Sequence, residues 1–366
     1  MKSKVYFTDM RTNHGENLPE KLKRLIDSAG LGGIELKNKY VAIKIHFGEP
    51  GNLAYLRPNY AKVLVDYVRE KGGRPFLTDC NTLYVGGRRN ALDHMDTAYV
   101  NGFSPFSTGC HVIIADGLKG TDEVVVDVNG EEVRHAKIGR ALYDADVIIS
   151  LNHFKGHMST GFGGAIKNLG MGGGSRAGKM EMHSADKPGV EQDHCIGCQT
   201  CATVCAHDAL SFDKGVAQID PNRCVGCCRC LAVCPEDAIM SLWDADRAIL
   251  NKRMVEYAVA VVKDKPHFHV SLAIDISPFC DCDDSNDAPI VGDIGMFASM
   301  DPVAIDHACA DAVNAMPVNA DSMLGEAAHT HGDHFADLHP STKWRVQMEH
   351  GKKMGLGSAD YELIKI

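Results

Sequence analysis

The chain has 366 residues, of which 45% are apolar and 23% charged, an ordinary balance for a globular protein. Its 48 acidic and 38 basic side chains give a net charge of −10, which argues against non-specific binding to nucleic acid or to an anionic membrane surface. We find neither an apolar run of the roughly 18 residues that a membrane helix needs nor a secretory signal pattern. We therefore expect a cytoplasmic protein, in which 14 cysteines indicate metal ligation or redox chemistry rather than a disulfide framework.

The first half of the chain alternates short apolar strands with amphipathic helices. We predict strands over 5–8, 40–46, 75–79, 111–115, 123–128 and 146–151. We predict helices near 17–29, 57–71, 87–100 and 161–169. This alternation is typical of βα units around a largely parallel, twisted sheet.

Polar and glycine-rich residues follow the end of the strand predicted at 146–151. Ligands of open α/β sheets bind beyond the carboxyl ends of the strands, and glycines there let a backbone approach a ligand. A helix that follows can offer free N–H groups to an anion. We therefore interpret residues 150–174 as a ligand-binding loop with cofactor-binding candidates Gly161, Gly163 and Gly164; the alternative is a flexible tether.

Four basic side chains are candidates for proton transfer or for binding an anionic group, namely His46, Lys155, His157 and Lys167. His46 ends an apolar strand at a loop, where catalytic residues commonly lie, although a hydrogen-bonded structural histidine fits equally well. The other three lie in the glycine-rich segment, next to His153.

Eight of the fourteen cysteines form an internal duplication in mid-chain. Each cysteine of the second run lies 29 positions after its counterpart in the first; the runs are Cys195, Cys198, Cys201 and Cys205, then Cys224, Cys227, Cys230 and Cys234. Three cysteines at this spacing wrap one iron–sulfur cubane, and the fourth ligates the other cluster. Zinc and structural disulfides fit the spacing less well.

We therefore expect two [4Fe–4S] clusters. Cys195, Cys198, Cys201 and Cys234 are assigned to one cluster, and Cys224, Cys227, Cys230 and Cys205 to the other. Residues 190–243 resemble a bacterial two-cluster ferredoxin domain. Cys228, between two ligands, is interpreted as a packed or spare thiol.

After this segment we expect a helix near 245–263, strands at 267–275 and 293–298, and helices at 302–313 and 341–353. The simplest architecture is one discontinuous α/β domain, 1–189 and 244–366, with a largely parallel sheet. The α+β ferredoxin-like module, 190–243, is inserted between its two parts. Two separate α/β domains are the alternative.

Three further patches carry candidate ligands or carboxylates. Cys280 and Cys282 could bind a soft metal or receive electrons, or they are spare loop thiols. His329, His331 and His334 are metal-ligand types in a loop that could equally be an exposed polar one. Asp301 and Asp306 flank a predicted helix start, where Asp301 fits an N-cap. We read the lone Cys80, Cys110 and Cys309 as small buried hydrophobes.

The segments KIHFGE, NHFKGHMSTGFGGAIKNLGMG, PFCDC and SMDPVAID, with the cysteine repeats between the second and third, resemble the DUF362 family of iron–sulfur proteins. The resemblance covers most of the chain and implies the fold and the clusters more than a reaction. The non-cluster domain of that family is similar in outline to lactate racemase-like proteins, which is an analogy of fold alone.

Three functions remain open from the sequence. The first is a redox enzyme that passes electrons from a partner protein through two clusters to a small-molecule substrate or cofactor in the α/β domain. The second is a ferredoxin-like electron carrier or complex subunit, and the third is a non-redox binding or isomerising protein with structural clusters. An additional anionic ligand or metal is compatible with the first.

Overall fold

The computed structural model describes residues 2–183, 187–213, 215–243, 245–327 and 329–366. Among these residues the largest element is an eight-stranded sheet. Its strands in spatial order are β16 (Tyr361–Lys365), β1 (Ser3–Asp9), β15 (Gly295–Ser299), β14 (His267–Ala273), β7 (Val147–His153), β2 (Tyr40–Lys44), β3 (Arg74–Asp79) and β4 (Val112–Ile114). Only β15 pairs antiparallel with its two neighbours, so the predicted α/β class with a largely parallel sheet is confirmed.

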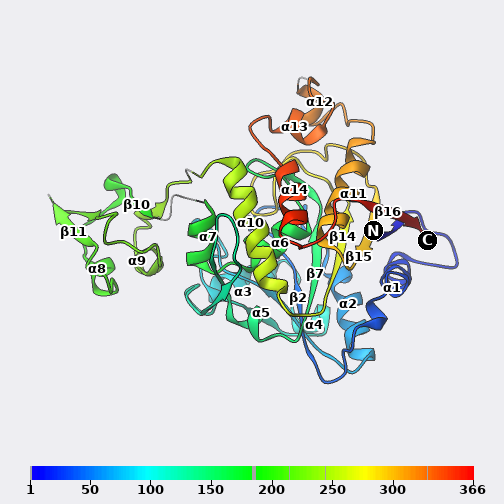
Figure 1. The fold of residues 1–366 in the computed structure, drawn as a ribbon, viewed down its shortest axis with the longest axis horizontal. Coiled ribbons are helices and arrows are strands. Elements are labelled where there is room, and N and C mark those ends of the chain that lie inside the picture. Colours follow the sequence, from blue (N-terminus) through cyan, green and yellow to red (C-terminus); the bar gives the residue numbers. More distant parts are fainter. Residues whose placement is uncertain (1, 184–186, 214, 244, 328) are drawn as a thin grey trace.

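Helices cover both faces of this sheet (Figure 1). Successive side chains of a strand point to opposite faces, so the apolar central strands need cover on both. On β2, Val41 and Ile43 join the hydrophobic cluster beneath α1 (Leu18–Ser28) and α2 (Pro58–Glu70). Ala42 joins the cluster on the other face, beneath α6 (Ala165–Gly173), α10 (Arg247–Val262) and α11 (Pro302–Asn314). Nearly continuous apolar strands are what a sheet buried on both faces requires.

The strand order reverses beside β2. The chain runs outward from β2 to β3 and β4, and then returns to place β7 on the opposite side of β2, followed by β14. A crevice forms at such a switch point, outside the carboxyl ends of the two strands. Strands β14, β15 and β16, which follow the cysteine-rich segment, lie in the same sheet as β1, β2, β3, β4 and β7, which precede it.

Two predicted elements differ from the structure. The helix predicted at 161–169 is wrong in its first turn, because β9 (Gly161–Gly163) pairs with β8 (Lys155–His157) and α6 begins only at Ala165. The strand predicted at 123–128 is present as β5 (Glu123–Asp127), but it pairs with β6 (His135–Gly139) in a hairpin outside the main sheet. The three-residue strands β8 and β9 are too short to show a hydrophobic period, and the partner of β5 cannot be read from its own sequence.

Seven further helices complete the described α/β part. They are α3 (Ala91–Val100), α4 (Pro105–Thr108), α5 (Arg140–Asp144), α7 (Arg176–His183), α12 (Met323–Glu326), α13 (His334–Leu338) and α14 (Arg345–Lys353). Among the residues described, no helix combines the length and the apolar character that crossing a membrane would take.

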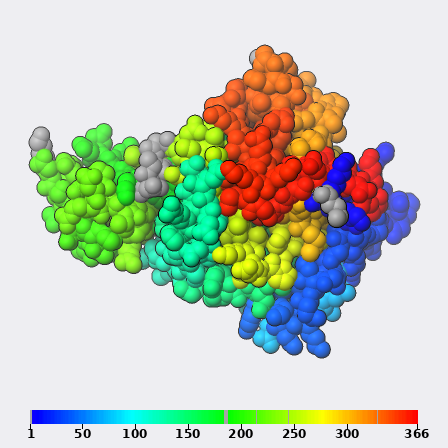
Figure 2. Space-filling model, in the orientation of Figure 1, coloured from blue at the N-terminus to red at the C-terminus, as the bar shows by residue number. Residues whose placement is uncertain are grey.

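The cysteine-rich segment forms a separate lobe, drawn in green to one side of Figure 1 and Figure 2. It contains β10 (Pro188–Val190), α8 (Thr200–Thr203), β11 (Leu210–Asp213), β12 (Val216–Ile219), α9 (Arg229–Val233) and β13 (Ile239–Ser241). β10 pairs with β13 and β11 with β12, both antiparallel, and α8 contacts α9. The lobe is therefore a βαββαβ unit made of two similar halves.

The backbone of this lobe repeats with the sequence. Left-handed residues occur in pairs 29 positions apart, namely Gly197 and Gly226, Gln199 and Cys228, and Asp208 and Asp237. Gln199 and Cys228 occupy the same place in each half, directly before α8 and α9. The duplication seen in the cysteine spacing is thus also a duplication of local conformation.

Candidate functional site

A cavity of about 400 Å³ opens at the carboxyl edge of the sheet, at the switch point between β2 and β7. Four parallel strands supply its lining directly or through the loop that follows each one. Lys44 and His46 come from β2, Asp79 and Cys80 from β3, and Lys155 follows β7. Cys280 and Cys282 come from the loop after β14. The size falls in the range of ordinary small-molecule sites.

The first wall of the cavity is a buried charge network. Lys44 Nζ lies 2.9 Å from Asp79 Oδ1 and donates to Asn168 Oδ1 at 2.7 Å. Arg88 binds Glu49 through Nε at 2.9 Å and Asp79 through Nη1 at 3.3 Å. Glu49 and Asp79 are therefore already paired, so they neutralise the cations around them rather than face the cavity as free bases.

His46, predicted as a candidate from its strand end, lines the cavity and is half-buried. Its Nδ1 accepts the N–H of Gly48 at 3.0 Å, which places the proton of the neutral ring on Nε2. Removal from water, reinforced by Arg88 and Lys155, holds the pKa of His46 well below its ordinary value. His46 is therefore neutral at pH 7, and its Nε2–H can donate a hydrogen bond to a bound group.

Lys155 is held by groups behind the cavity. Its Nζ donates to the carbonyl of His153 at 3.0 Å and lies 3.3 Å from Asp281 Oδ2. Asp281 also binds His153 Nδ1 at 2.7 Å. Burial alone would raise the pKa of Asp281, but His153 and Lys155 lower it, so the carboxylate is ionised and orients Lys155.

Lys167 contacts a cysteine directly. From the second position after the start of α6, its Nζ donates to Cys280 Sγ at 3.1 Å. Burial alone would lower the pKa of Lys167, but the Cys280 thiolate and then Cys282 raise it. The pKa of Cys280 is held well below its ordinary value by a hydrogen bond from Cys282 and by the Lys167 and Lys155 ammonium groups.

Cys282 behaves in the opposite way. Its S–H donates a hydrogen bond to Cys280, which raises the pKa of Cys282, and burial raises it further. The pKa of Cys282 therefore lies well above its ordinary value. The pair therefore holds one thiolate and one thiol. A turn closed by the N–H of Asp283 on the carbonyl of Cys280, at 2.9 Å, places both side chains toward the cavity.

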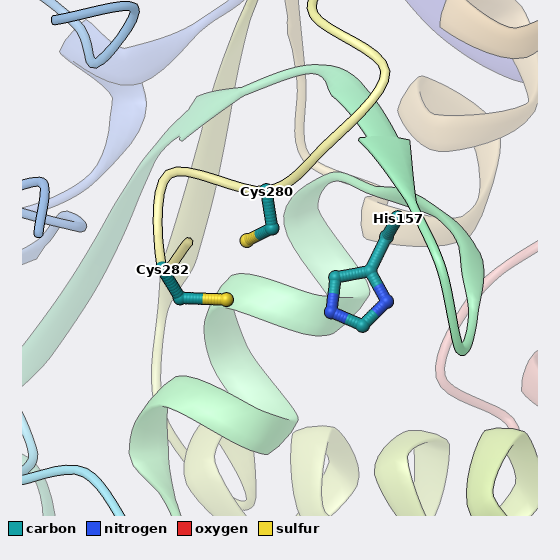
Figure 3. Close-up of side chains that lie close together, drawn as sticks. All are labelled: His157, Cys280 and Cys282. Carbon is teal, nitrogen blue, oxygen red and sulfur yellow. The ribbon is translucent and has the colours of Figure 1, made fainter. Parts of the chain in front are cut away.

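His157 completes this group. One ligand atom from each of His157, Cys280 and Cys282 lies within 4.8 Å of the other two, and Figure 3 shows the imidazole edge turned toward both sulfur atoms. Two thiols and an imidazole are ligand types that zinc and copper accept. Among the described residues these three form the one group of possible metal ligands that meets this distance.

Two observations make this group a poor cation site. His157 Nδ1 accepts the N–H groups of Ser159 at 3.0 Å and Thr160 at 3.2 Å, so the neutral ring carries its proton on Nε2. A metal-bound histidine normally donates its second nitrogen rather than accepting with it. The Lys167 ammonium already occupies one side of Cys280 Sγ, where it would repel a metal ion. The arrangement fits a thiolate surrounded by hydrogen-bond donors.

Close packing requires glycine at two of the three candidate positions. A Cβ on Gly164 would lie 2.3 Å from Asp306 Oδ1, and a Cβ on Gly161 would lie 2.7 Å from Trp344 Cβ. Gly163 faces Lys155 and Lys167 and leaves room for both. Gly163 and Gly164 line the cavity, whereas Gly161 does not.

The start of α6 is closed by a carboxylate. Asp306 accepts the N–H groups of Ala165 at 2.6 Å and Ile166 at 2.9 Å. The expected free N–H groups at this helix start are therefore occupied, and the segment is a hairpin followed by helices rather than a flexible tether. Lys155 and Lys167 therefore remain as candidates for binding an anionic group in the cavity.

The eight repeat cysteines gather around two small cavities in the lobe. Cys195, Cys198, Cys201 and Cys234 line one, and Cys205, Cys224, Cys227 and Cys230 line the other, with Cys228 beside them. The N–H of Ala217 points to Cys195 Sγ at 3.3 Å, and that of Ala209 to Cys205 Sγ at 3.4 Å. Backbone donors of this kind are typical of thiolates that hold an iron–sulfur cluster.

Leu83 connects the lobe to the cavity of the α/β part. It lines that cavity and also belongs to the hydrophobic cluster that contains Cys201 and Cys228. Arg89, from the same loop, donates to the carbonyl of Cys234 at 3.0 Å and pairs with Asp237. Sequence analysis missed both residues, because nothing in a loop sequence indicates what lies across an interface.

The remaining candidates do not join the site. Asp337 binds His331 at 2.9 Å and lies 3.9 Å from His329, whereas His334 turns to the carbonyl of Met316 at 3.0 Å, so the three histidines do not converge. Asp301 caps α11, as the N-cap prediction states. Cys110 and Cys309 are buried, as expected, and Cys80 is buried at the cavity wall.

Comparison with known proteins agrees with the motifs. The family described as domain of unknown function (DUF362) matches residues 41–311, which is most of the chain. The chain belongs to this family. None of the curated proteins matches it.

Among solved structures, this DUF362 chain resembles the lactate racemase apoprotein from Thermoanaerobacterium thermosaccharolyticum, with a TM-score of 0.39, 11% identity, and coverage of 75% of this chain and 51% of that one. A crystal structure of a protein from Thermotoga maritima has a TM-score of 0.39, 13% identity, and coverage of 95% and 60%. The chain thus spans between half and two thirds of the length of these two structures.

Proposed function

We propose that this DUF362 protein is an iron–sulfur redox enzyme that delivers electrons to a small molecule bound in the cavity at the carboxyl edge of the sheet. The observation that carries the proposal is the shared position of Leu83, which packs against the cysteine lobe on one side and lines the cavity on the other. An electron carrier alone needs no polar cavity behind its clusters.

In this proposal residues 190–243 are a two-cluster ferredoxin domain inserted into one α/β domain, 1–189 and 244–366. Cys195, Cys198, Cys201 and Cys234 would hold one [4Fe–4S] cluster, and Cys205, Cys224, Cys227 and Cys230 the other. When bound, the clusters supply one-electron transfer. Two sets of four thiols with N–H donors to sulfur support this assignment.

The cavity residues would bind and protonate the substrate. Lys155 and Lys167 attract an anionic group, and their orientation by Asp281 and Cys280 fixes where that group lies. His46 and His157 each present a neutral ring with its proton on Nε2, so each can donate a hydrogen bond to the substrate, and the lysine ammonium groups are the source of a proton when an electron arrives. Gly163 keeps the space between the lysines open.

The test is whether a bound ligand depends on the cavity and not on the lobe. Small molecules released by denaturation from anaerobically purified protein are identified by mass spectrometry and compared among the wild type, Lys155→Ala and Lys119→Ala. We expect the wild type to release a ligand that is missing from Lys155→Ala, although the iron content of this variant equals that of the wild type. Lys119 lies outside the cavity, so Lys119→Ala should retain the ligand. A ligand retained in full by Lys155→Ala would place binding elsewhere and contradict the proposal.

An electron-donating partner protein belongs to the same proposal. Cys198 is exposed on the lobe, and the lobe projects away from the α/β part (Figure 1). The cysteine set that includes Cys198 therefore lies where a redox protein could approach it. A ferredoxin-like electron carrier or complex subunit would need the same exposure. This second candidate function would be favoured if neither a ligand nor an electron-accepting group were found in the cavity.

A further inference from the structure

The Cys280–Cys282 pair has a chemistry of its own that the lysines and histidines of the cavity do not explain. Both side chains line the cavity, and their sulfur atoms lie within 4.8 Å of each other. They are two residues apart on one turn, closed by the hydrogen bond from Asp283 to Cys280. The two thiols can thus meet without a rearrangement of distant elements.

The surroundings of the pair differentiate the two sulfur atoms. Lys167 Nζ donates to Cys280 Sγ at 3.1 Å, and Cys282 offers its S–H to the same atom. Asp281, between them, points away into its bonds with His153 and Lys155. Cys280 is thus the nucleophile, and Cys282 retains a proton and lies in reach to resolve what Cys280 forms.

We propose that Cys280 and Cys282 form a redox-active dithiol–disulfide couple that reacts with a small organic disulfide bound in the cavity. This inference deepens the proposed function, on which it rests for the source of electrons, by naming the group that exchanges them with the substrate. Reactive cysteines lie in electropositive surroundings that a substrate can reach, whereas structural ones are buried in apolar contacts. Cys280 is only 3% exposed, but it lines the cavity beside the ammonium groups of Lys167 and Lys155.

The reaction proceeds by thiol–disulfide exchange. The Cys280 thiolate attacks one sulfur of the substrate, breaks its S–S bond, forms a mixed disulfide and releases one thiolate. Cys282 then attacks Cys280 Sγ, forms the internal disulfide, releases the second substrate sulfur and gives its proton to a departing thiolate. The pair loses two electrons and one proton, and the substrate disulfide gains them. Two one-electron transfers and one proton return the pair to its starting state.

Cys80 provides a built-in comparison. It lies in the same cavity wall, but its Sγ faces the carbonyl of Gly173 at 3.5 Å, and burial raises the pKa of its thiol far above the ordinary value. A thiol in such surroundings is unreactive. Accessibility to the cavity alone therefore does not make a reactive cysteine, and the difference lies in the donors around Cys280.

The experiment equilibrates anaerobic, cluster-containing protein in buffers with stepped ratios of reduced to oxidised dithiothreitol. Samples are acid-quenched, alkylated and mapped by mass spectrometry. We expect Cys280 and Cys282 to become protected together along a two-electron curve, with a peptide containing their disulfide, while Cys80 stays a free thiol throughout. Free thiols at both positions at every ratio, including with glutathione disulfide as oxidant, would overturn the proposal.

Two variants test the assigned roles. In Cys282→Ser, Cys280 can still attack glutathione disulfide, but no second thiol is present to resolve the mixed disulfide. A stable mixed disulfide with glutathione is therefore expected on Cys280. In Cys280→Ser, Cys282 is expected to stay free. A mixed disulfide that forms on Cys282 and not on Cys280, or a stoichiometric zinc or copper ion lost in either variant, would overturn the assignment.

The outcome is separable from that of the proposed function. Iron and acid-labile sulfide are counted in the same Cys280→Ser and Cys282→Ser samples and are expected to match the wild type. A functioning couple in protein without clusters would refute the electron source and keep the couple. Full cluster content with no couple would refute the couple alone.

Discussion

Lys167 Nζ donates a hydrogen bond to Cys280 Sγ at 3.1 Å, joining the first turn of α6 to the loop that follows β14. The two residues are 113 positions apart, and the cysteine lobe is inserted between them in the sequence. This ion pair joins the two flanks of the chain at the cavity, together with the contacts of Asp281 to His153 and Lys155. With the hydrogen bond from Cys282, it lowers the pKa of Cys280.

Replacing Lys167 with Gln should raise the pKa of Cys280, because the nearest ammonium is lost while Cys282, Asp281 and Lys155 still face the thiol. In the wild type, alkylation of Cys280 by iodoacetamide should remain fast as the pH falls below about 8, since the thiolate persists there. In Lys167→Gln the pH at which the rate begins to fall should move upward, and below that pH the rate should fall about tenfold for each pH unit. Lys179→Gln is the control, because that cavity lysine donates to the carbonyl of Gly174 instead. Identical pH–rate profiles in the wild type and Lys167→Gln would refute this role.

Removing one repeat cysteine should affect one cysteine set only. Cys198→Ala is expected to lose roughly half of the iron, about four of eight ions per chain, while the second set keeps its own. Cys228→Ala is the matched control, since Cys228 lies among the ligands but is buried with its S–H directed to the carbonyl of Gly226. Iron and sulfide analysis of anaerobic samples gives the result. A loss in Cys228→Ala as large as that in Cys198→Ala would contradict the assignment.

Asp306→Ala should destabilise the α/β domain by about 1–3 kcal/mol, because two buried N–H groups at the start of α6 lose their acceptor. Asp311→Ala, on the exposed side of the same helix, should cost far less. Urea unfolding followed by circular dichroism compares the two. A loss in Asp306→Ala no larger than in Asp311→Ala would show that the N–H groups find other partners.

Asp306 also predicts a pH dependence with a definite sign. Burial raises its pKa to about 7 from 3.8, despite the two N–H donors. Between these values the folded protein holds a proton that the unfolded chain has released, so this group makes stability fall as the pH rises from about 4 to 7. Asp306→Asn should lack that contribution, and its free energy of unfolding should rise relative to the wild type from pH 5 to pH 8. A difference that is constant with pH would contradict the raised pKa.

Arg89 predicts how the lobe is attached. Arg89→Glu should repel Asp237 and remove the bond to the carbonyl of Cys234, so amide hydrogens near 234–238 should exchange faster while the iron content is unchanged. Adding Asp237→Arg should restore part of the protection by re-forming the pair in reverse. If the single variant exchanges at the wild-type rate, Arg89 does not hold the lobe.

Much of the fold followed from local pattern. The strands β2, β3, β7 and β14 are apolar runs buried on both faces. The helices α1 and α2 are clearly amphipathic, and α10 and α11 begin at the capping residues Asp246 and Asp301, so each element was predicted within a few residues. The β8–β9 hairpin was not, because three-residue strands rich in glycine have no period to detect. The order of the strands in the sheet could not be predicted from the sequence either, since it depends on pairings between distant segments.

In the candidate site, too, local sequence predicted some residues and missed the contacts that depend on distant segments. His46, Lys155, His157 and Lys167 were predicted from their place after strand ends, and the structure brings all four to one cavity. The role of Asp306 as a cap on α6 could not be predicted, because Asp306 and the start of α6 are about 140 positions apart. A carboxylate near a helix start is normally interpreted as a cap on that same helix. The glycines looked like a ligand cradle for a similar reason: their neighbours Asp306 and Trp344 come from distant segments.

The central claim is that the lobe holds two [4Fe–4S] clusters that serve the cavity, and one measurement tests it most directly. Protein purified without oxygen is analysed for iron and sulfide and then followed by EPR during stepwise reduction. The account predicts about eight irons per chain and two magnetically coupled reducible clusters. Fewer than about four irons in intact, oxygen-protected protein would contradict it.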